Sequence, residues 1–321
     1  MPIVDMPLEE LRKYTGRNPR PADFDRYWEE GLAEMRAVDP HLELKPSDDF
    51  CAKGADCCDL RFTGVGGSRV YAKLLKPKGA KNTPAVLLFH GYTGSSGEWA
   101  GKLSYVAEGF TVVAMDCRGQ GGLSDDTVPV HGTTYSGHIV RGLSDPDPRA
   151  LAFRRVYLDC AQLAYITMGL DFVDPTRIAC TGGSQGGGLS IACASLVPEI
   201  KKAAPMIPFL CDYKRVWEMD LDQGAYAELR AWFRAFDPAH KREDAVFERL
   251  GYIDNVHLAD RIKADVLMGV GLLDTICPPS TQFAAYNRMT CKKDMLVLPD
   301  FAHEMTGEFS DATFMFIEQM L

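Results

Sequence analysis

Five residues in the second half of the chain combine a potential nucleophile with the backbone freedom that such a residue requires. The run GGSQG at 182–186 follows the β-branched stretch 177–181 and precedes a predicted helix over 187–197. This G-x-S-x-G pattern is typical of a nucleophile elbow, in which a serine occupies a strained turn between a strand and a helix. The flanking glycines supply the bare backbone that so sharp a turn needs. We therefore expect Ser184 to attack acyl carbonyl groups, the alternative being an ordinary glycine-rich structural turn.

A serine hydroxyl becomes a strong nucleophile only when a base accepts its proton and a carboxylate orients that base. In chains with an elbow, the acid and then the histidine follow the serine in sequence. Of the histidines after Ser184, His303 alone lies in a loop that follows a late predicted strand and precedes a last helix beginning at Ser310. His240 and His257 have no such position, so His303 is the predicted general base.

Asp274 is the predicted acid of this arrangement. It follows the apolar strand 266–271 and precedes the Pro278-Pro279 pair, so its carboxylate lies just beyond an edge of the sheet. Asp300, close before the histidine, is typical of a turn, and Asp265 lies at the wrong end of the strand. The structural alternative for Asp274 is the N-cap of the following helix.

Acyl transfer also needs two N–H donors for the oxyanion that develops on the carbonyl oxygen. The residue after an elbow serine, here Gln185, supplies one donor, and a loop after an early strand supplies the other. The loop 89–94 (FHGYTG) follows an apolar run, and its His-Gly pair allows close backbone approach. We expect the second N–H to belong to Tyr92, whose ring is either a wall of the acyl pocket or a plain packing aromatic. His90 is expected to brace the loop.

Short apolar runs alternate with helical patterns from residue 70 onward. The clearest helix spans 149–169, where apolar residues recur at steps of three and four. This alternation predicts an α/β fold with a mostly parallel central sheet and helices on both faces, in one domain over 1–321. The predicted strands are 70–75, 85–89, 111–115, 178–181, 203–207, 266–271 and 295–298.

Three segments do not follow this alternation. Residues 1–60 contain an amphipathic helix after Pro21 and are predicted to form an N-terminal helical extension packed on the same domain. Residues 122–148 form a long insertion, expected to be a pocket rim or an oligomer contact, with a mobile surface loop as the alternative. Residues 211–258 are rich in aromatic residues and helical in pattern, as a cap over the carboxyl ends of the strands would be.

The charge balance argues against polyanionic partners. The chain has 321 residues, with 35 Lys or Arg and 44 Asp or Glu, which gives a net charge of −9 at pH 7. Because no basic block offsets this charge locally, we expect neither nucleic acid nor a membrane as partner. Residues 1–14 lack the basic and apolar regions of a signal peptide, and no stretch approaches the length of a membrane span.

Cysteine usage points to a reducing compartment. The ten cysteines form no C-x-x-C pair, and several lie inside apolar runs. We therefore expect reduced, buried thiols in a cytoplasmic protein. A zinc site is the weaker alternative, because the seven histidines do not lie at ligand spacing from these cysteines.

Three motifs stand in order along the chain, and other short stretches accompany them. The motifs are RGQG at 118–121, GGSQGGG at 182–188 and HE at 303–304. The accompanying short stretches include FHGY at 89–92 and PFLC at 208–211. Together they resemble the signatures of carbohydrate esterase family seven, the acetyl xylan esterases and cephalosporin-C deacetylases, over nearly the whole chain.

The resemblance implies an α/β-hydrolase fold and assigns roles to particular residues. Ser184, Asp274 and His303 would form the catalytic triad, and the N–H groups of Tyr92 and Gln185 would form the oxyanion hole. Pro208 would line a small acyl pocket together with Tyr92, while Arg118 and Gln120 would brace the site without reacting.

The resemblance also implies an activity and an assembly. The substrates would be small acetylated molecules, such as acetylated xylo-oligosaccharides and cephalosporin C, which are deacetylated through an acetyl-enzyme without a metal or other cofactor. The assembly would be a hexamer, a trimer of dimers, with the insertion 122–148 at an interface. The alternatives are a general short-chain carboxylesterase with another natural substrate and, in a different class, a non-catalytic hydrolase-fold binding protein.

Overall fold

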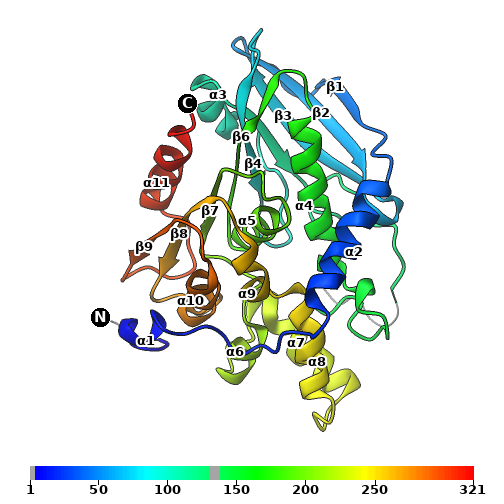
Figure 1. Cartoon of the computed structure of the whole chain (residues 1–321), viewed down its shortest axis with the longest axis vertical. Helices are drawn as coiled ribbons and strands as arrows, with labels where there is room; N and C mark the ends of the chain where they lie inside the picture. Colours follow the sequence, from blue (N-terminus) through cyan, green and yellow to red (C-terminus); the bar gives the residue numbers. More distant parts are fainter. Residues whose placement is uncertain (1–3, 131–137) are drawn as a thin grey trace.

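The computed structural model describes residues 4–130 and 138–321, and within them nine strands form one sheet (Figure 1). Their order is β1-β2-β3-β5-β4-β6-β7-β8-β9. The strands from β5 to β9 in this order pair in parallel, whereas β1, β2, β3 and β5 pair antiparallel. The predicted α/β fold with a mostly parallel sheet is therefore confirmed. The strands are β1 (Glu43–Pro46), β2 (Ala55–Thr63), β3 (Arg69–Pro77), β4 (Thr83–Phe89), β5 (Thr111–Met115), β6 (Val173–Gly183), β7 (Lys202–Met206), β8 (Asp265–Gly271) and β9 (Lys293–Leu298).

Helices cover both faces of this sheet (Figure 1). Successive residues of the central strands point to opposite faces, so Leu87 and Val113 belong to the core cluster that includes α4 and α5, while Val86 and Val112 belong to the one that includes α3 and α11. Both faces are thus buried, which explains why these strands are continuous apolar runs. The helices are α1 (Leu8–Leu11), α2 (Phe24–Ala37), α3 (Leu103–Ala107), α4 (Ala152–Met168), α5 (Gln185–Leu196), α6 (Tyr213–Glu218), α7 (Ala227–Phe236), α8 (Glu243–Leu250), α9 (Asn255–Leu258), α10 (Pro279–Arg288) and α11 (Gly307–Glu318).

The N-terminal extension is only partly helical, which corrects the prediction for residues 1–60. The predicted amphipathic helix is α2, whose buried residues include Phe24, Trp28 and Met35. The following part contains β1 and most of β2, which extend the sheet beyond β3. β2 buries Cys57, Leu60 and Phe62 against the core but keeps polar residues between them, so it has no continuous apolar run to reveal it.

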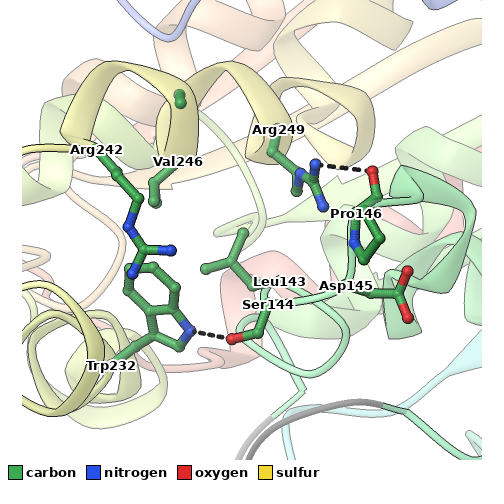
Figure 2. A pocket seen from close by; sticks show the side chains of 9 residues that line it. Leu143, Ser144, Asp145, Pro146, Trp232, Arg242, Val246 and Arg249 are labelled. Carbon is green, nitrogen blue, oxygen red and sulfur yellow. Dashed lines mark hydrogen bonds between the residues drawn. The ribbon is translucent and has the colours of Figure 1, made fainter.

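Residues 211–258 hold the helices α6, α7, α8 and α9, with short 3₁₀ turns between them. The described parts of the insertion, 122–130 and 138–148, contain no helix or strand longer than the 3₁₀ turn that begins at Pro148, while residues 131–137 lie outside the description. Figure 2 shows that the end of the insertion meets α7 and α8 around a small pocket. There Trp232 Nε1 donates to Ser144 Oγ at 3.1 Å, and Arg249 Nη2 donates to the Pro146 carbonyl at 3.0 Å.

Within residues 4–130 and 138–321, no helix has both the length and the apolar character that a membrane span requires.

Candidate active site

The turn after β6 has the geometry of a nucleophile elbow. Ser184 has φ 57° and ψ −118°, a left-handed conformation that is strained for a residue with a Cβ. A Cβ on Gly182 or Gly186 would collide with the carbonyl oxygen of Phe89 on the neighbouring strand β4. Both glycines are therefore required by the close approach of two backbones, as the motif predicts. Helix α5 begins at Gln185 and is buried on all sides, which fixes the turn from its far end.

Three side chains from separate parts of the chain meet at Ser184. The Ser184 Oγ and His303 Nε2 atoms lie 2.8 Å apart, and His303 Nδ1 lies 2.8 Å from Asp274 Oδ2. Because a carboxylate only accepts hydrogen bonds, Nδ1 carries the proton and Nε2 accepts from the serine hydroxyl. The structure thus brings together the three residues that the sequence singled out.

The carboxylate of Asp274 is held in place by several donors. It is fully buried, and its Oδ1 accepts from the N–H groups of Ile276 at 2.9 Å and Cys277 at 2.8 Å. Oδ2 also accepts from Gln282 Nε2 at 3.2 Å. These bonds leave the carboxylate one orientation, toward the histidine. They also explain why Asp274, Cys277 and His303 bring potential metal-ligand atoms within 4.8 Å of one another.

The other candidates for acid and base lie in different surroundings. His240 is exposed beside Glu243, and Asp265 is at the start of β8 beside Lys292. His257 is buried with neither ring nitrogen bonded to a described residue, and burial lowers its pKa to about 4. Asp300 is exposed. None of these is joined to Ser184 by a hydrogen bond among the described residues.

The two segments that carry the expected oxyanion donors follow adjacent strands. Phe89 at the end of β4 pairs with Gly182 near the end of β6, so the loop that carries Tyr92 and the turn that carries Gln185 leave the same edge of the sheet. Within the described part of the chain, neither the N–H of Tyr92 nor that of Gln185 donates a hydrogen bond to a backbone or side-chain acceptor. Both N–H groups are consequently available for a ligand oxygen.

His90 and Gln120 brace these loops. His90 Nδ1 contacts the Gly91 carbonyl at 2.7 Å, while its Nε2 accepts from the Cys117 N–H at 2.9 Å. Gln120 Oε1 accepts from the Thr93 N–H at 2.9 Å, and Gln120 Nε2 donates to Gln185 Oε1 at 2.8 Å. Gln120 therefore ties the loop after β4 to the first residue of α5.

Arg118 is more deeply buried than Gln120 and forms an ion pair with Asp159 of α4. Its Nε donates to Asp159 Oδ2 at 2.6 Å, and its Nη1 donates to the Val65 carbonyl at 2.9 Å. A buried bidentate pair of this kind fixes geometry more than it adds stability. The sequence did not reveal Asp159 as the partner, because a single acid inside an apolar helix belongs to no motif.

A strained segment from Ile207 to Asp212 lies against the elbow. Ile207, Leu210 and Asp212 have φ values of 41°, 67° and 48°. Pro208 is buried in this segment, and the N–H of the next residue, Phe209, donates to the Ser184 carbonyl at 2.9 Å. The segment thus lies directly beside the nucleophile. Pro208 therefore has the position expected for a residue that limits the size of the acyl group.

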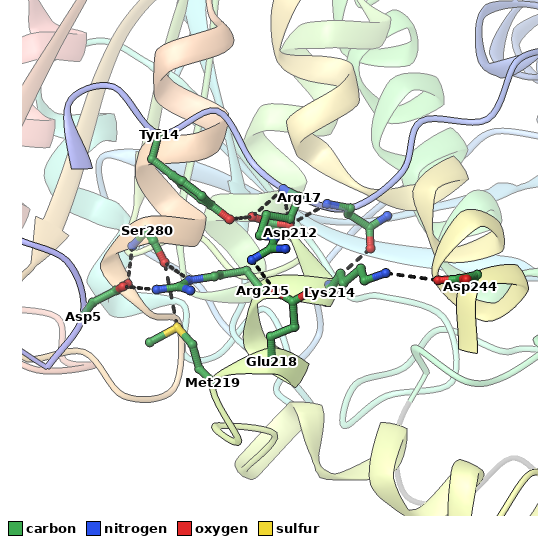
Figure 3. Close-up of polar contacts among 11 residues, drawn as sticks. Asp5, Tyr14, Arg17, Asp212, Lys214, Arg215, Glu218, Met219, Asp244 and Ser280 are labelled. Carbon is green, nitrogen blue, oxygen red and sulfur yellow. Dashed lines mark hydrogen bonds and ion pairs between the residues drawn. The ribbon is translucent and has the colours of Figure 1, made fainter. Parts of the chain in front are cut away.

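The end of this strained segment is anchored by the N-terminal residues (Figure 3). The Asp212 carboxylate accepts from the Tyr14 hydroxyl at 2.6 Å and from the N–H groups of Arg17 at 3.0 Å and Asn18 at 2.9 Å. Burial and the neighbouring Asp212 charge raise the pKa of Asp254, whose carboxylate accepts from the Asp212 N–H. None of these partners was predicted from the sequence.

The chain is similar to known acetyl xylan esterases in sequence and in fold. The family model described as acetyl xylan esterase (AXE1) matches residues 1–320. The crystal structure of acetyl xylan esterase 1 from Thermoanaerobacterium sp. JW/SL YS485 is 55% identical, with a TM-score of 0.97 over 98% of this chain and 99% of that one. The acetyl xylan esterase from Paenibacillus sp. R4 is 35% identical, with a TM-score of 0.94 over 98% of this chain and 100% of that one.

A longer relative shows the same likeness over part of its length. Acetyl esterase Axe7A of Xylanibacter ruminicola is 28% identical over 306 residues, which are 94% of this chain. The chain spans 66% of the length of that relative. With a family match over almost every residue and an α/β-hydrolase fold shared with esterases, the chain belongs to the acetyl xylan esterase family.

Proposed function

We propose that the chain is a serine esterase that removes acetyl groups from small acetylated substrates through an acetyl-enzyme intermediate. The observation that carries this proposal is the continuous hydrogen-bonded series from Ser184 through His303 to Asp274, with both contacts at 2.8 Å. Nucleophile and base are within proton-transfer distance, and the base is oriented by a buried acid.

In the first half-reaction, His303 accepts the Ser184 proton while the serine oxygen attacks the acetyl carbonyl carbon. Asp274 stabilises the imidazolium that forms and keeps the ring in the required tautomer. The N–H groups of Tyr92 and Gln185 donate to the oxyanion of the tetrahedral intermediate. His303 then gives its proton to the departing alcohol, and the acetyl-enzyme remains.

In the second half-reaction, water replaces the alcohol. His303 takes a proton from the water as it attacks the acetyl-enzyme, and the same two N–H groups stabilise the second oxyanion. Collapse of this intermediate returns the proton to Ser184 and releases acetate. Arg118 and Gln120 react with nothing. Gln120 ties the loop of Tyr92 to Gln185, and Arg118 fixes the neighbouring segment through its ion pair with Asp159.

Two experiments distinguish this esterase from the two alternative functions. One measures how the rate depends on acyl-chain length, and the other measures covalent labelling of Ser184. Pro208 and the Tyr92 ring would restrict the acyl pocket, so rates on aryl esters should fall steeply beyond acetyl or propionyl. A flat series would instead indicate a general carboxylesterase. A non-catalytic binding protein would form no covalent adduct at Ser184 with a serine-reactive phosphonate.

We further propose acetylated xylo-oligosaccharides and cephalosporin C as substrates, a hexameric trimer of dimers as the assembly, and the cytoplasm as the location. Family membership supports the substrates and the assembly. All ten cysteines are free, which supports a reducing compartment. Acetate release measured side by side from acetylated xylo-oligosaccharides, polymeric xylan and cephalosporin C would rank the substrates.

Replacement of Ser184 by alanine tests the core of the proposal. Folded Ser184→Ala protein should lose acetyl-ester turnover by a factor on the order of 10⁵ or more, because the nucleophile is absent. The assay is the release of 4-nitrophenol from its acetate, with circular dichroism as the check of folding. A folded variant that keeps a tenth of the wild-type rate would remove Ser184 from its role.

A further inference from the structure

A buried carboxylate from the helical segment contacts the loop that carries the second oxyanion donor. Glu228 of α7 is 5% exposed, and its Oε1 accepts from the Tyr92 hydroxyl at 2.8 Å and from the Ile139 N–H at 3.0 Å. The Tyr92 hydroxyl in turn accepts from the His138 N–H at 2.8 Å. Glu228 therefore joins the oxyanion loop, the end of the insertion and α7 through one oxygen atom.

Burial of the Glu228 carboxyl group at this position is energetically unfavourable. Its second oxygen, Oε2, is buried and has no hydrogen-bond partner among the described residues. Burial raises the pKa of the Glu228 carboxyl to about 7. An apolar side chain of similar volume would avoid this desolvation, so the carboxyl group is poorly explained by stability alone.

The backbone next to Tyr92 is strained and needs support from both sides. Thr93 has φ 57°, a left-handed conformation that is strained for a β-branched residue. On one side, the Thr93 N–H is held by Gln120. On the other, the Tyr92 ring lies edge-on to Phe209 with centroids 5.5 Å apart, and its hydroxyl is held by Glu228. Release of either restraint would let the turn relax and move the Tyr92 N–H.

The helix that carries Glu228 is itself fixed to the protein. One turn later on the same face, Trp232 is bonded to Ser144, and Arg249 of α8 is bonded to Pro146 (Figure 2). α7 is thus bonded to the insertion at Trp232 as well as at Glu228, and α8 is bonded to the same insertion beside it.

From these contacts we propose that Glu228 is a positioning residue for the oxyanion hole, which it serves by holding the Tyr92 hydroxyl and thereby the orientation of the Tyr92 N–H. This inference rests on the proposed function, in which that N–H stabilises the tetrahedral oxyanion. It gives the helical segment 211–258 a role in the chemical step, in addition to any role in covering the site.

The test compares three variants of the full chain with 4-nitrophenyl acetate at pH 7.5. Glu228→Leu should lower kcat about 10- to 100-fold with little change in KM, because a displaced donor weakens binding of the transition state more than of the substrate. Glu228→Gln keeps an oxygen at the same place and should restore kcat to within about threefold of wild type. Tyr92→Phe removes the donor hydroxyl and should lower kcat in the same direction as Glu228→Leu.

Two further measurements separate positioning from stability. The double variant of Glu228→Leu and Tyr92→Phe should be no slower than the slower single variant, because both changes break one bond. Covalent labelling of Ser184 by an aryl phosphonate should slow by the same factor as kcat. Asp237→Leu is the matched control. Among the described residues, this buried carboxylate of the same segment accepts only from the N–H groups of Lys241 and Arg242, so its loss should lower stability and leave kcat unchanged.

Several outcomes would overturn the inference. These are a folded Glu228→Leu variant with kcat within twofold of wild type, an equal loss in Glu228→Gln, or an equal loss in Asp237→Leu. If Glu228→Leu does not fold, Tyr92→Phe decides, and wild-type kcat in that variant rejects the role. Failure of the proposed function has a different signature, because Ser184→Ala would then retain turnover or Ser184 would escape phosphonate labelling.

Discussion

Ser184 is half-buried and has a strained, left-handed backbone, which neighbouring groups hold in place. Its N–H donates to the Met206 carbonyl at 3.0 Å, and its carbonyl accepts from the N–H groups of Phe209 at 2.9 Å and Gly188 at 3.0 Å. These three bonds lie within the buried body of the fold and offset the roughly 1–3 kcal/mol of strain at such a residue. The strained turn is therefore held by the fold itself, without a contribution from substrate.

Glu228 gives the clearest pH-dependent prediction. Its pKa is raised from 4.5 to about 7 in the folded chain, so between these values the unfolded chain releases a proton that the folded chain retains. The free energy of unfolding therefore falls as pH rises through this window, by about 3 kcal/mol in total. Glu228→Gln removes this effect and should gain that amount relative to wild type between pH 4.5 and pH 7.5.

Urea unfolding of both proteins across this pH range measures the difference. His138, whose pKa is lowered to about 4 by burial, titrates in both proteins and so cancels when the two curves are subtracted. The Tyr92 hydroxyl, whose pKa is raised by burial and by Glu228, remains protonated throughout. A difference that is constant with pH would show that the carboxyl group titrates at its ordinary value.

The reacting residues were predictable from the sequence, and His90, Arg118 and Gln120 were expected to brace the site, whereas the supporting residue Glu228 was not. Ser184 lies in a motif, and the order of serine, acid and histidine along the chain narrows the choice to Asp274 and His303. Glu228 contacts a tyrosine 136 positions away and has no motif of its own. Contacts of this kind depend on how two distant elements pack, which local pattern does not encode.

At the scale of elements, the strands that lie between two helical layers were the easiest to predict. Their apolar runs reflect burial on both faces, and the predicted 111–115 coincides with β5. β1 has every residue exposed and β2 mixes polar and apolar residues, so neither produced a signal. The missed strands are accordingly those at the antiparallel edge, far from the carboxyl ends that carry the site.

The N-terminal segment before α2 secures the strained residues beside the elbow. Asp212→Asn should lower the free energy of unfolding by about 2–4 kcal/mol, because an amide cannot accept from all of the donors that surround the buried carboxylate. Acetyl-ester turnover should fall as well, because Asp212 ends the segment that contains Pro208. Urea unfolding and steady-state rates measure the two effects.

Tyr14→Phe is the graded control for this prediction. It removes one donor to Asp212 and should lower the free energy of unfolding by about 1 kcal/mol with turnover retained. If Asp212→Asn unfolds at the same urea concentration as wild type, the N-terminal residues do not anchor this segment.

At the scale of the whole molecule, contacts within one chain do not account for the whole of the insertion 122–148. Its end is held by α7 and α8, yet it presents Leu123, which is 56% exposed, to the surroundings. Leu123 is a single exposed apolar residue, and it lies in the segment that the family resemblance places at an interface, so it is the position at which we test the proposed hexamer. Sedimentation of the wild-type protein should therefore give six times the chain mass of 35.5 kDa.

A charge at this position tests both the interface and its effect on access to the site. Leu123→Glu should yield smaller species at micromolar concentration, because a buried unpaired carboxylate opposes association. Met315→Glu, at a residue of α11 that is 63% exposed and outside the insertion, is the matched control and should sediment as wild type does.

The Leu123→Glu variant also tests access to the site. If the assembly encloses the sites, Leu123→Glu should raise the rate on polymeric acetylated xylan relative to the rate on a short oligosaccharide, because opening the assembly removes a size barrier while the triad stays intact. Equal sedimentation of the two variants would place the interface elsewhere, and an unchanged ratio of rates in a dissociated variant would show that the subunits do not limit access.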